Sequence, residues 1–301
     1  MKRGLVILML WSALLGCDTS VDPIEGTERP FTMWGLVNPE VDTQAVRLFS
    51  IENQLQLIGD VDLDATFTSR NQTTGEVRVW KDSLVTLADG DRRHVFWSAF
   101  PVHHGETFTF EAQRSDSATS TTAPVTVPPP VTVRVAEPNR GQVRPILLPV
   151  RVDGEPPTMP RIDVEYQVES VAGAGTTTTR ALNVIVPYEG RAQPVNGGWE
   201  INVDLTADVE AVREAYDAFD ERFALLVLNA IEARIHVGDA AWVSPIGRFD
   251  AEVLVEPGLF SNVENGFGFV GAAYVDTVRW VPPLELLQRA GYVNQQTRAP
   301  H

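Results

Sequence analysis

The fold is decided by a stretch in the middle of the chain, which reads Arg161-Ile162-Asp163-Val164-Glu165-Tyr166-Gln167-Val168. Polar and apolar side chains alternate along it, and successive side chains of a β-strand point to opposite faces of a sheet. The stretch therefore predicts a half-buried strand with one apolar face. The same period of two recurs on both sides of it, so the sequence predicts a mostly β protein.

Upstream of this stretch, residues 30–128 show short strand patterns separated by turn residues. Alternation occurs at 61–67 and 76–80, and further strands are expected at 94–100 and 107–113; turns are expected at 71–75 and 88–91. About seven short strands over roughly a hundred residues are typical of an immunoglobulin-like sandwich. The first domain is therefore expected to be an immunoglobulin-like β-sandwich.

The expected boundary between two domains is a segment rich in Ser, Thr and Pro, from Thr119 to Pro130. It ends in three successive prolines, which cannot lie inside a sheet because they lack the N–H donor. The segment is predicted to be a stiff extended spacer. Residues 131–282 are then expected to form a second β-rich domain. The regular alternation of strands and helices that would predict a parallel sheet is not found in the sequence.

The second domain is expected to contain one inserted helix. Thr206 is predicted to cap it and Asp208 to lie in its first turn. Apolar residues follow at the spacing of one helix face: Val209, Val212, Tyr216 and Phe219. Strands are expected at 177–187, 199–203, 223–237 and 249–255, and residues 283–301 are expected to form a short helix and a tail.

An export signal is predicted at the start of the chain. Lys2 and Arg3 precede an apolar run from Leu5 to Leu15, and a glycine then precedes the only cysteine, Cys17. A charged region, a short apolar region and a small residue before the cleavage site describe a secretory signal. The run is too short for a spanning helix, which needs about 20 apolar residues.

The position of the cysteine makes the signal resemble that of a bacterial lipoprotein. Residues 1–16 are then removed, Cys17 becomes the acylated first residue, and the polar residues up to 29 form a lipidated tether. Membrane attachment through this lipid anchor is therefore expected. Stable anchoring requires more than one acyl chain, because one chain binds membranes only reversibly.

The charge of the chain is strongly acidic. Its formal net charge is −16, and loss of Lys2 and Arg3 on cleavage brings it to −18. Nucleic acid is excluded as an expected partner, because phosphate binding requires a basic footprint. An acidic, lysine-poor surface would suit a salt-rich milieu, in which repulsion between like charges is screened. A bias of the genome toward Arg codons explains the scarcity of lysine equally well.

Two patterns superficially indicate metal binding and neither is favoured. His103 and His104 are adjacent, so on a strand they point to opposite faces and cannot readily share a metal ion. The run of alternating carboxylates from Asp60 to Asp64 resembles the start of a calcium loop, but Ala65 and Asn71 stand where the loop needs Gly and Glu. No metal and no cofactor are therefore expected.

Tryptophans offer a possible ligand surface. Most aromatic side chains of a sandwich are expected in its core. Trp80 shares the polar register of its strand with Arg78, so it is predicted to be the most exposed tryptophan. Exposed aromatic faces of this kind would favour a carbohydrate or peptide groove.

A glycine-rich segment near the end of the chain reads Leu259-Phe260-Ser261-Asn262-Val263-Glu264-Asn265-Gly266-Phe267-Gly268-Phe269-Val270-Gly271-Ala272. Ser and Asn side chains form turn and capping hydrogen bonds, and glycines in strands mark bulges or close backbone approach. We interpret the segment as a buried corner leading into the last strand, with a ligand or partner surface as the alternative.

This segment resembles the closing motif of a lipoprotein family common in Bacteroidota-type bacteria, Ser-Asn-Ile-Glu-Asn-Gly-x-Gly-x-Phe-Gly. Seven residues match it: Ser261, Asn262, Glu264, Asn265, Gly266, Gly268 and Gly271. The family combines a lipidated cysteine, an immunoglobulin-like domain and a mixed second β domain. Its members are often encoded near TonB-dependent outer-membrane receptors, which implies a role in nutrient uptake or surface assembly. It has no established activity, so the resemblance implies no catalytic residues.

The sequence thus predicts a non-enzymatic binding or accessory protein that is lipid-anchored in the cell envelope, with a TonB-dependent receptor as the expected partner. The outer membrane is the favoured location, although Asp18 leaves the inner membrane open. A carrier of glycans or peptides is the alternative. A hydrolytic enzyme is least favoured, because no nucleophile, base and orienting residue can be assembled from the spacing.

Overall fold

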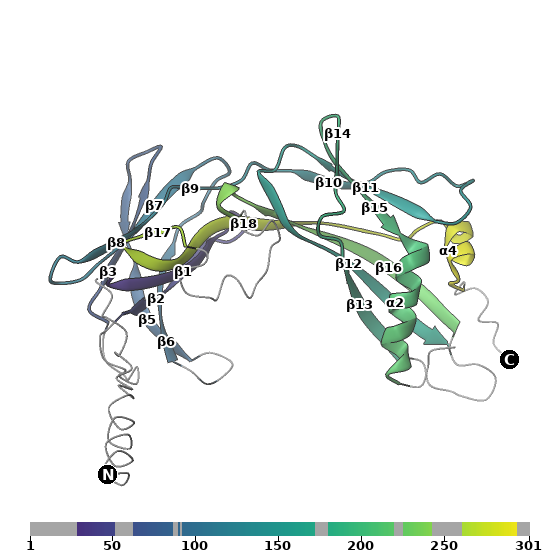
Figure 1. The fold of residues 1–301 in the computed structure, drawn as a ribbon, viewed down its shortest axis with the longest axis horizontal. Helices are drawn as coiled ribbons and strands as arrows, with labels where there is room; N and C mark the ends of the chain where they lie inside the picture. Colours follow the sequence, from purple (N-terminus) through teal and green to yellow (C-terminus); the bar gives the residue numbers. More distant parts are fainter. Residues whose placement is uncertain are drawn as a thin grey trace, which may run out of the picture.

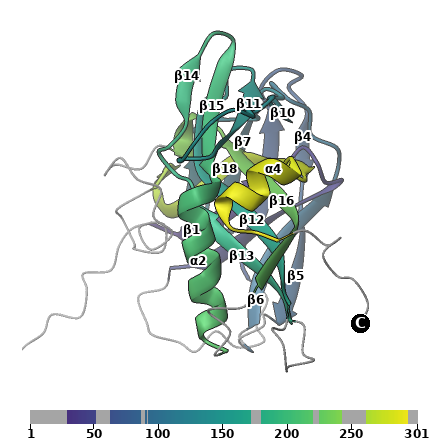
Figure 2. The same cartoon turned by 90° about the vertical axis from the view of Figure 1, so that its right-hand side faces the viewer.

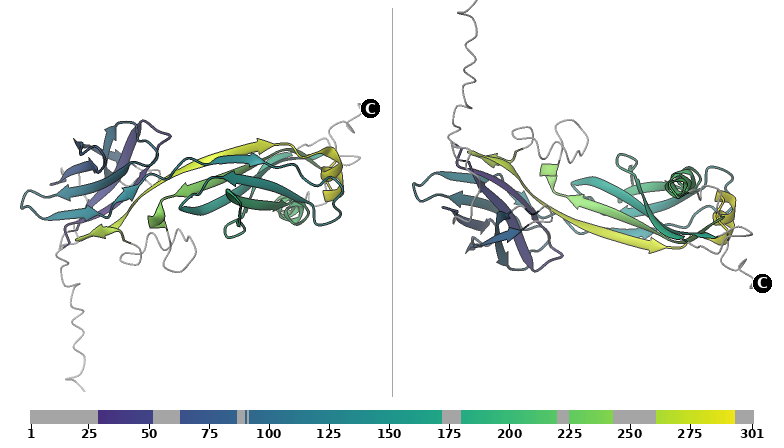
Figure 3. Two further views of the ribbon diagram at one scale, coloured as in Figure 1. Left: turned by 90° about the horizontal axis from the view of Figure 1, so that it is seen from above. Right: turned by 90° about the horizontal axis from the view of Figure 1, so that it is seen from below.

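The protein consists of two β modules joined end to end along one long axis (Figure 1; Figure 3). The computed structural model describes residues 29–51, 63–86, 90, 92–171, 180–219, 225–242 and 261–293. Strands dominate both modules, and one longer helix is inserted in the second. The predicted fold class, mostly β with a sandwich followed by a second β-rich unit, is confirmed.

The first module has the two-sheet strand order of an immunoglobulin domain. One layer contains, in spatial order, β1 (Phe31–Val37), β2 (Thr43–Ser50), β6 (Arg92–Ala99) and β5 (Lys81–Thr86). The facing layer contains β8 (Thr119–Thr122), β7 (Thr107–Gln113), β3 (Thr66–Asn71) and β4 (Val77–Val79). When the strands are lettered in chain order, the first layer contains strands A, B, E and D and the facing layer contains strands G, F, C and C′. This is the immunoglobulin arrangement.

Aromatic side chains fill the space between the two layers. The Phe67 ring packs edge-on against Trp80 at a centroid distance of 5.2 Å, and against Phe96 at 5.5 Å and Phe110 at 6.1 Å. All four side chains are buried. Rings from both layers therefore meet at Phe67, which lies at the centre of the core of this module.

Trp80 is buried, with 4% of its surface exposed, so the prediction of an exposed tryptophan is wrong. The chain leaves one layer after β4 and enters the other at β5, and Trp80 is the residue between them. The change of layer breaks the alternation, so the Trp80 side chain turns inward and its indole N–H donates to Ser69 Oγ at 2.9 Å. Val79 is 68% exposed instead.

The second module pairs another two layers around its own core. One layer continues from the first module and contains, in order, β18 (Gly266–Trp280), β16 (Leu225–Gly238), β12 (Thr158–Val171) and β13 (Arg180–Pro187). The facing layer contains β10 (Thr132–Val135), β11 (Leu147–Asp153), β15 (Gly198–Asp204) and β14 (Gln193–Val195). The apolar face of the 161–168 stretch is buried in this core, as its alternation predicts.

The opposite face of that stretch is less exposed than its pattern suggests. Asp163 and Glu165 are both buried, and each carboxylate has an arginine partner. Arg161 lies 2.7 Å from Asp163, and Arg234 of the neighbouring strand lies 2.6 Å from Glu165. Ion pairing compensates for the loss of water around these two carboxylates.

Helix α2 (Leu205–Asp217) lies against β13 and β11, and α4 (Leu284–Ala290) lies beside it at the far end of the molecule (Figure 2). The cap of α2 is Asp204, whose carboxylate accepts the N–H groups of Thr206 and Ala207, so the prediction of Thr206 as the cap is wrong. Thr206 Oγ1 instead accepts the N–H of Ile146 at 3.0 Å. Phe219 lies beyond the end of the helix and is 44% exposed.

The Thr119–Pro130 segment is not a free spacer. Its first residues form β8, and β9 (Val125–Thr126) pairs with β7. Ser and Thr alternate between core and solvent here, with Ser120 and Thr122 buried. Only the proline-rich end leaves the sheet. Within the described ranges, no helix has the length and apolar composition needed to cross a membrane.

Replacing Phe67 by alanine is expected to lower the free energy of unfolding by about 3–5 kcal/mol, because the cavity would lie where rings of both layers meet. The matched control is Phe219→Ala, since the Phe219 side chain is 44% exposed; it should cost less than about 1 kcal/mol. Urea denaturation of both variants measures the difference. Equal losses would contradict this account of the core.

Candidate functional site

The glycine-rich motif, residues 261–271, forms a hairpin that closes one edge of the first module. β17 (Val263–Glu264) pairs with β8 in one layer, and β18 pairs with β1 in the other. The hairpin therefore bridges the two layers of the sandwich. The β1–β18 pair is parallel, from Phe31 opposite Gly266 to Val37 opposite Ala272, whereas no parallel pairing is predicted from the sequence.

Asn262 joins the two arms of this hairpin. Its Nδ2 donates to the carbonyl of Val270 at 2.7 Å, and its Oδ1 accepts the N–H of Val270 at 3.0 Å. Its own carbonyl accepts the N–H of Ala123 at 2.8 Å. The Ser261 hydroxyl accepts the N–H of Val263 at 3.3 Å. The side chains of both residues are therefore used in internal hydrogen bonds.

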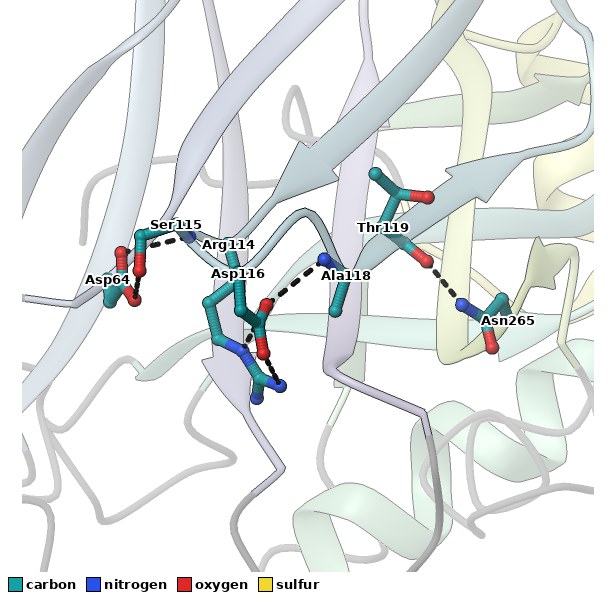
Figure 4. Close-up of polar contacts among 7 residues, drawn as sticks. All are labelled: Asp64, Arg114, Ser115, Asp116, Ala118, Thr119 and Asn265. Atoms are coloured by element: carbon teal, nitrogen blue, oxygen red, sulfur yellow. Dashed lines mark hydrogen bonds and ion pairs between the residues drawn. The ribbon is translucent and has the colours of Figure 1, made fainter.

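Asn265 fixes the tip of the hairpin to the neighbouring strand. It adopts a left-handed conformation with φ of 51°. Its Nδ2 donates to the carbonyl of Thr119 at 2.5 Å (Figure 4), and its carbonyl accepts the hydroxyl of Ser120 at 2.6 Å. Glu264 is exposed at this tip.

The turn before Thr119 is held by an ion pair, also drawn in Figure 4. Arg114 donates to Asp116 at 2.6 Å, and the N–H of Ala118 donates to the same carboxylate at 3.0 Å. These contacts, the Arg114 hydrogen bond first, lower the pKa of Asp116 to about 2. The turn next to the motif therefore keeps its charge pair over the whole physiological pH range.

Two of the motif glycines, Gly266 and Gly268, are required by the close approach of β1. Gly268 has φ of +96°, and a Cβ atom there would lie 2.0 Å from the carbonyl oxygen of Met33. A Cβ at Gly266 would lie 2.8 Å from the carbonyl oxygen of Phe31. Gly271 leaves room for the ring of Phe269. These contacts favour the structural interpretation of the motif over a ligand surface.

Asp239 holds the point at which β18 passes from the first module to the second. β18 pairs with β1 up to Ala272, and from Ala273 onward it pairs with β16. The N–H of Asp239 donates to the Ala272 carbonyl at 2.9 Å, and its Oδ2 accepts the Ala272 N–H at 3.0 Å. Its Oδ1 accepts the N–H of Ala241 at 2.9 Å. We call this group the joint.

The carboxyl of Asp239 is buried, and desolvation raises its pKa from 3.8 to about 6 against the opposing effect of the backbone donors. Sequence reasoning missed this residue. The signal that could have found it is an acidic residue directly after the long apolar strand of residues 225–238. An Asp in that position has N–H groups of the following turn within reach.

The proline-rich segment is attached to β18 on the other side of the joint. The Tyr274 hydroxyl donates to the Pro129 carbonyl at 2.8 Å and accepts the Val131 N–H at 2.9 Å. Asp276 accepts the N–H of Val133 at 3.1 Å. These hydrogen bonds attach the chain from Pro129 to Val133 to β18.

His104 belongs to the same region, and the two adjacent histidines are used differently. His104 Nδ1 lies 2.6 Å from the Pro128 carbonyl, and its ring packs on that of Tyr274. The main-chain N–H of His103 donates to Glu106 at 2.7 Å. Among the described residues, no group of three His, Cys, Asp or Glu side chains could hold a metal ion.

Two of the predicted sites lie wholly or partly outside the described residues. They are Cys17 with its signal and tether, and the carboxylate run up to Asp62. Asp64 is described, and its carboxylate accepts the hydroxyl of Ser115 at 2.6 Å (Figure 4). The expected strand at 249–255 also lies outside the described residues.

Comparison with known proteins adds no relative. No protein-family model matches the chain, and no curated protein matches it.

Replacing Gly268 by alanine is expected to prevent the first module from folding, or to cost more than about 3 kcal/mol, because a Cβ would overlap the Met33 carbonyl. The matched control is Gly190→Ala. Gly190 also has positive φ, +71°, but nothing lies within 4 Å of its Cβ position; it should cost about 1–2 kcal/mol. Thermal unfolding monitored by circular dichroism compares them. A similar small loss in both would refute the close approach.

The buried carboxyl of Asp239 predicts a pH dependence. Its folded pKa of about 6 exceeds the ordinary 3.8, so between these values the folded protein holds a proton that the unfolded chain has released. The unfolding free energy should therefore fall as pH rises from 4 to 6, on the order of 2 kcal/mol from this group. The difference in unfolding free energy between the wild type and Asp239→Asn, measured at each pH, isolates the contribution of this carboxyl. Parallel pH profiles would contradict the assignment.

Proposed function

We propose that this chain is a lipid-anchored, non-enzymatic accessory protein of the bacterial cell envelope, which holds a partner-binding surface at a fixed distance from the membrane. The anchor would be Cys17, whose position after a short apolar run and a glycine suits lipidation. The partner would be a TonB-dependent receptor in the same membrane, as the family resemblance implies.

The continuity of β18 is the observation that carries this proposal. One strand of 15 residues pairs with β1 in the first module and with β16 in the second. At about 3.3 Å per residue it spans roughly 50 Å. Two modules that share backbone hydrogen bonds cannot swing freely about a linker, so they form one rigid body.

The geometry supports a spacer between membrane and partner. The described chain enters through β1 in the first module, whereas α2 and α4 lie at the opposite end of the long axis (Figure 1). A protein anchored at its first residue would therefore present that opposite end away from the membrane. Anchoring in one bilayer also raises the local concentration of the protein near a receptor, which strengthens a weak contact.

The alternative function, a carrier of glycans or peptides, loses its main support. It depended on an exposed aromatic face, and the tryptophan chosen for that role, Trp80, packs in the core.

Two measurements test the proposal in intact cells. Radiolabelled palmitate should enter the wild-type protein and not Cys17→Ala, and only the wild type should sediment with membranes. Cross-linking and purification should recover a TonB-dependent receptor with the wild type, and at least about tenfold less with the unanchored variant, because the local concentration is lost. Absence of label would remove the anchor; recovery of no envelope protein would remove the partner.

A further inference from the structure

A pocket lies at the end of the molecule that is far from the first module. It has a volume of about 380 Å³ and lies between α2, the end of α4 and the loop before β11. That volume is within the range of small-molecule sites, roughly 300–1,000 Å³. The lining includes Arg144, Thr206, Val209, Glu210, Arg213 and Gly291.

Two guanidinium groups line this pocket without a carboxylate partner in the part of the chain that the structure describes. Arg213 is half-buried on α2, and no ion pair or hydrogen bond to another described residue occupies it. Arg144 donates only to a main-chain carbonyl, that of Arg289, at 3.4 Å. By contrast, Arg134 on the same module is paired with Asp153 at 2.5 Å.

These two positions are notable in an acidic protein. Acidic residues number 40 against 24 Lys and Arg, so carboxylates are plentiful. The half-buried guanidinium of Arg213 has lost part of its hydration and is stabilised by an anionic partner. Arg144 is exposed but lines the same pocket, so the two positive charges together make a site for an anion.

The loop that carries Arg144 is fixed in place, so the pocket is preformed. Arg289 Nη1 on α4 donates to the carbonyls of Arg140 at 2.8 Å and Gln142 at 3.1 Å. Arg140 in turn lies 3.7 Å from Glu285 at the start of α4. A loop whose main chain is already fixed loses less entropy on binding than a mobile loop does.

The remaining lining groups define the ligand more closely. The Thr206 hydroxyl accepts the Ile146 N–H, so its own proton is available to an acceptor. Val209 and Ala290 add an apolar wall. The first amides of α2 are already capped by Asp204, so the arginines carry the recognition. Glu210 is the one acidic residue of the lining, and its charge opposes an anion.

We propose that this pocket binds the oxyanion group, a carboxylate or a phosphate, of a small ligand that also has a short apolar part. The planar guanidinium offers paired N–H donors that match either oxyanion. The site is independent of the lipid anchor and of any receptor.

Calorimetric titration of the full chain in non-ionic detergent, at constant ionic strength, tests this site with inorganic phosphate and with succinate. Arg213→Gln and Arg144→Gln should each weaken binding at least about tenfold, since each removes a charged hydrogen-bonding group. Arg213→Lys should give an intermediate loss, because it keeps the charge without the paired donors. Glu210→Gln should strengthen binding about threefold by removing the opposing charge.

Arg134→Gln is the matched control, because Arg134 is an exposed arginine outside the pocket; it should leave the affinity unchanged. Circular dichroism checks that each variant is folded, and Arg144 is exposed enough to be replaced without loss of packing. Binding of phosphate alone assigns a phosphate ligand, and binding of succinate alone a carboxylate ligand. Failure of both probes to bind the wild type at millimolar concentration, or wild-type affinity in both Arg→Gln variants, would overturn the site.

Discussion

The structure depends on one constraint, which is that a single strand must complete two different sheets. β18 supplies the edge neighbour of β1 over Gly266–Ala272 and the neighbour of β16 over Ala273–Trp280. Unpaired backbone groups in a buried strand are costly, so neither module can release this strand without losing a row of hydrogen bonds. Rotation of one module against the other would require that loss at the joint. The long axis of the molecule is therefore a property of the sheet and not of a linker.

Buried carboxylates are held by directed hydrogen-bond donors at two places in the molecule. In the second module, Tyr166 and Tyr188 both donate to the carboxylate of Asp208 in the first turn of α2. Burial raises the pKa of Asp208, as it does for Asp239 at the joint. In both places the carboxylate receives directed donors and no full counter-charge. Such groups specify where a helix or strand must end, because a shifted register would leave them without partners.

The local alternation of polar and apolar residues predicted much of this fold. It failed where contacts between residues distant in sequence determine the structure. The strands at 107–113 and 162–168 are as expected, because alternation depends only on which face meets a core. Trp80 was misplaced, since a change of layer inside one strand pattern leaves no local mark. The β8 and β9 strands were missed because Ser and Thr are also typical of linkers. The parallel pair of β1 and β18 joins residues more than 200 positions apart, and no property of either segment alone indicates the other.

The candidate site was likewise predictable from the sequence only in part. The Gly-rich motif was singled out by composition, and its contacts became clear only with β1 and β8 beside it. Asp204 competes with Thr206 for the cap of α2, and both are good capping residues, so geometry alone separates them. The two pocket arginines come from segments about 70 residues apart. Spacing in sequence could not bring them together.

The parallel pairing also sets the order in which the molecule can mature. β1 is synthesised more than 200 residues before β18, the strand that becomes its parallel neighbour. The first module therefore waits with an open edge until β18 has been synthesised. Pairing across so large a separation is intrinsically slow, and an open edge invites pairing with other chains. A product shortened before Gly266 would keep that edge open, so the fold itself distinguishes molecules that contain β18 from molecules that lack it.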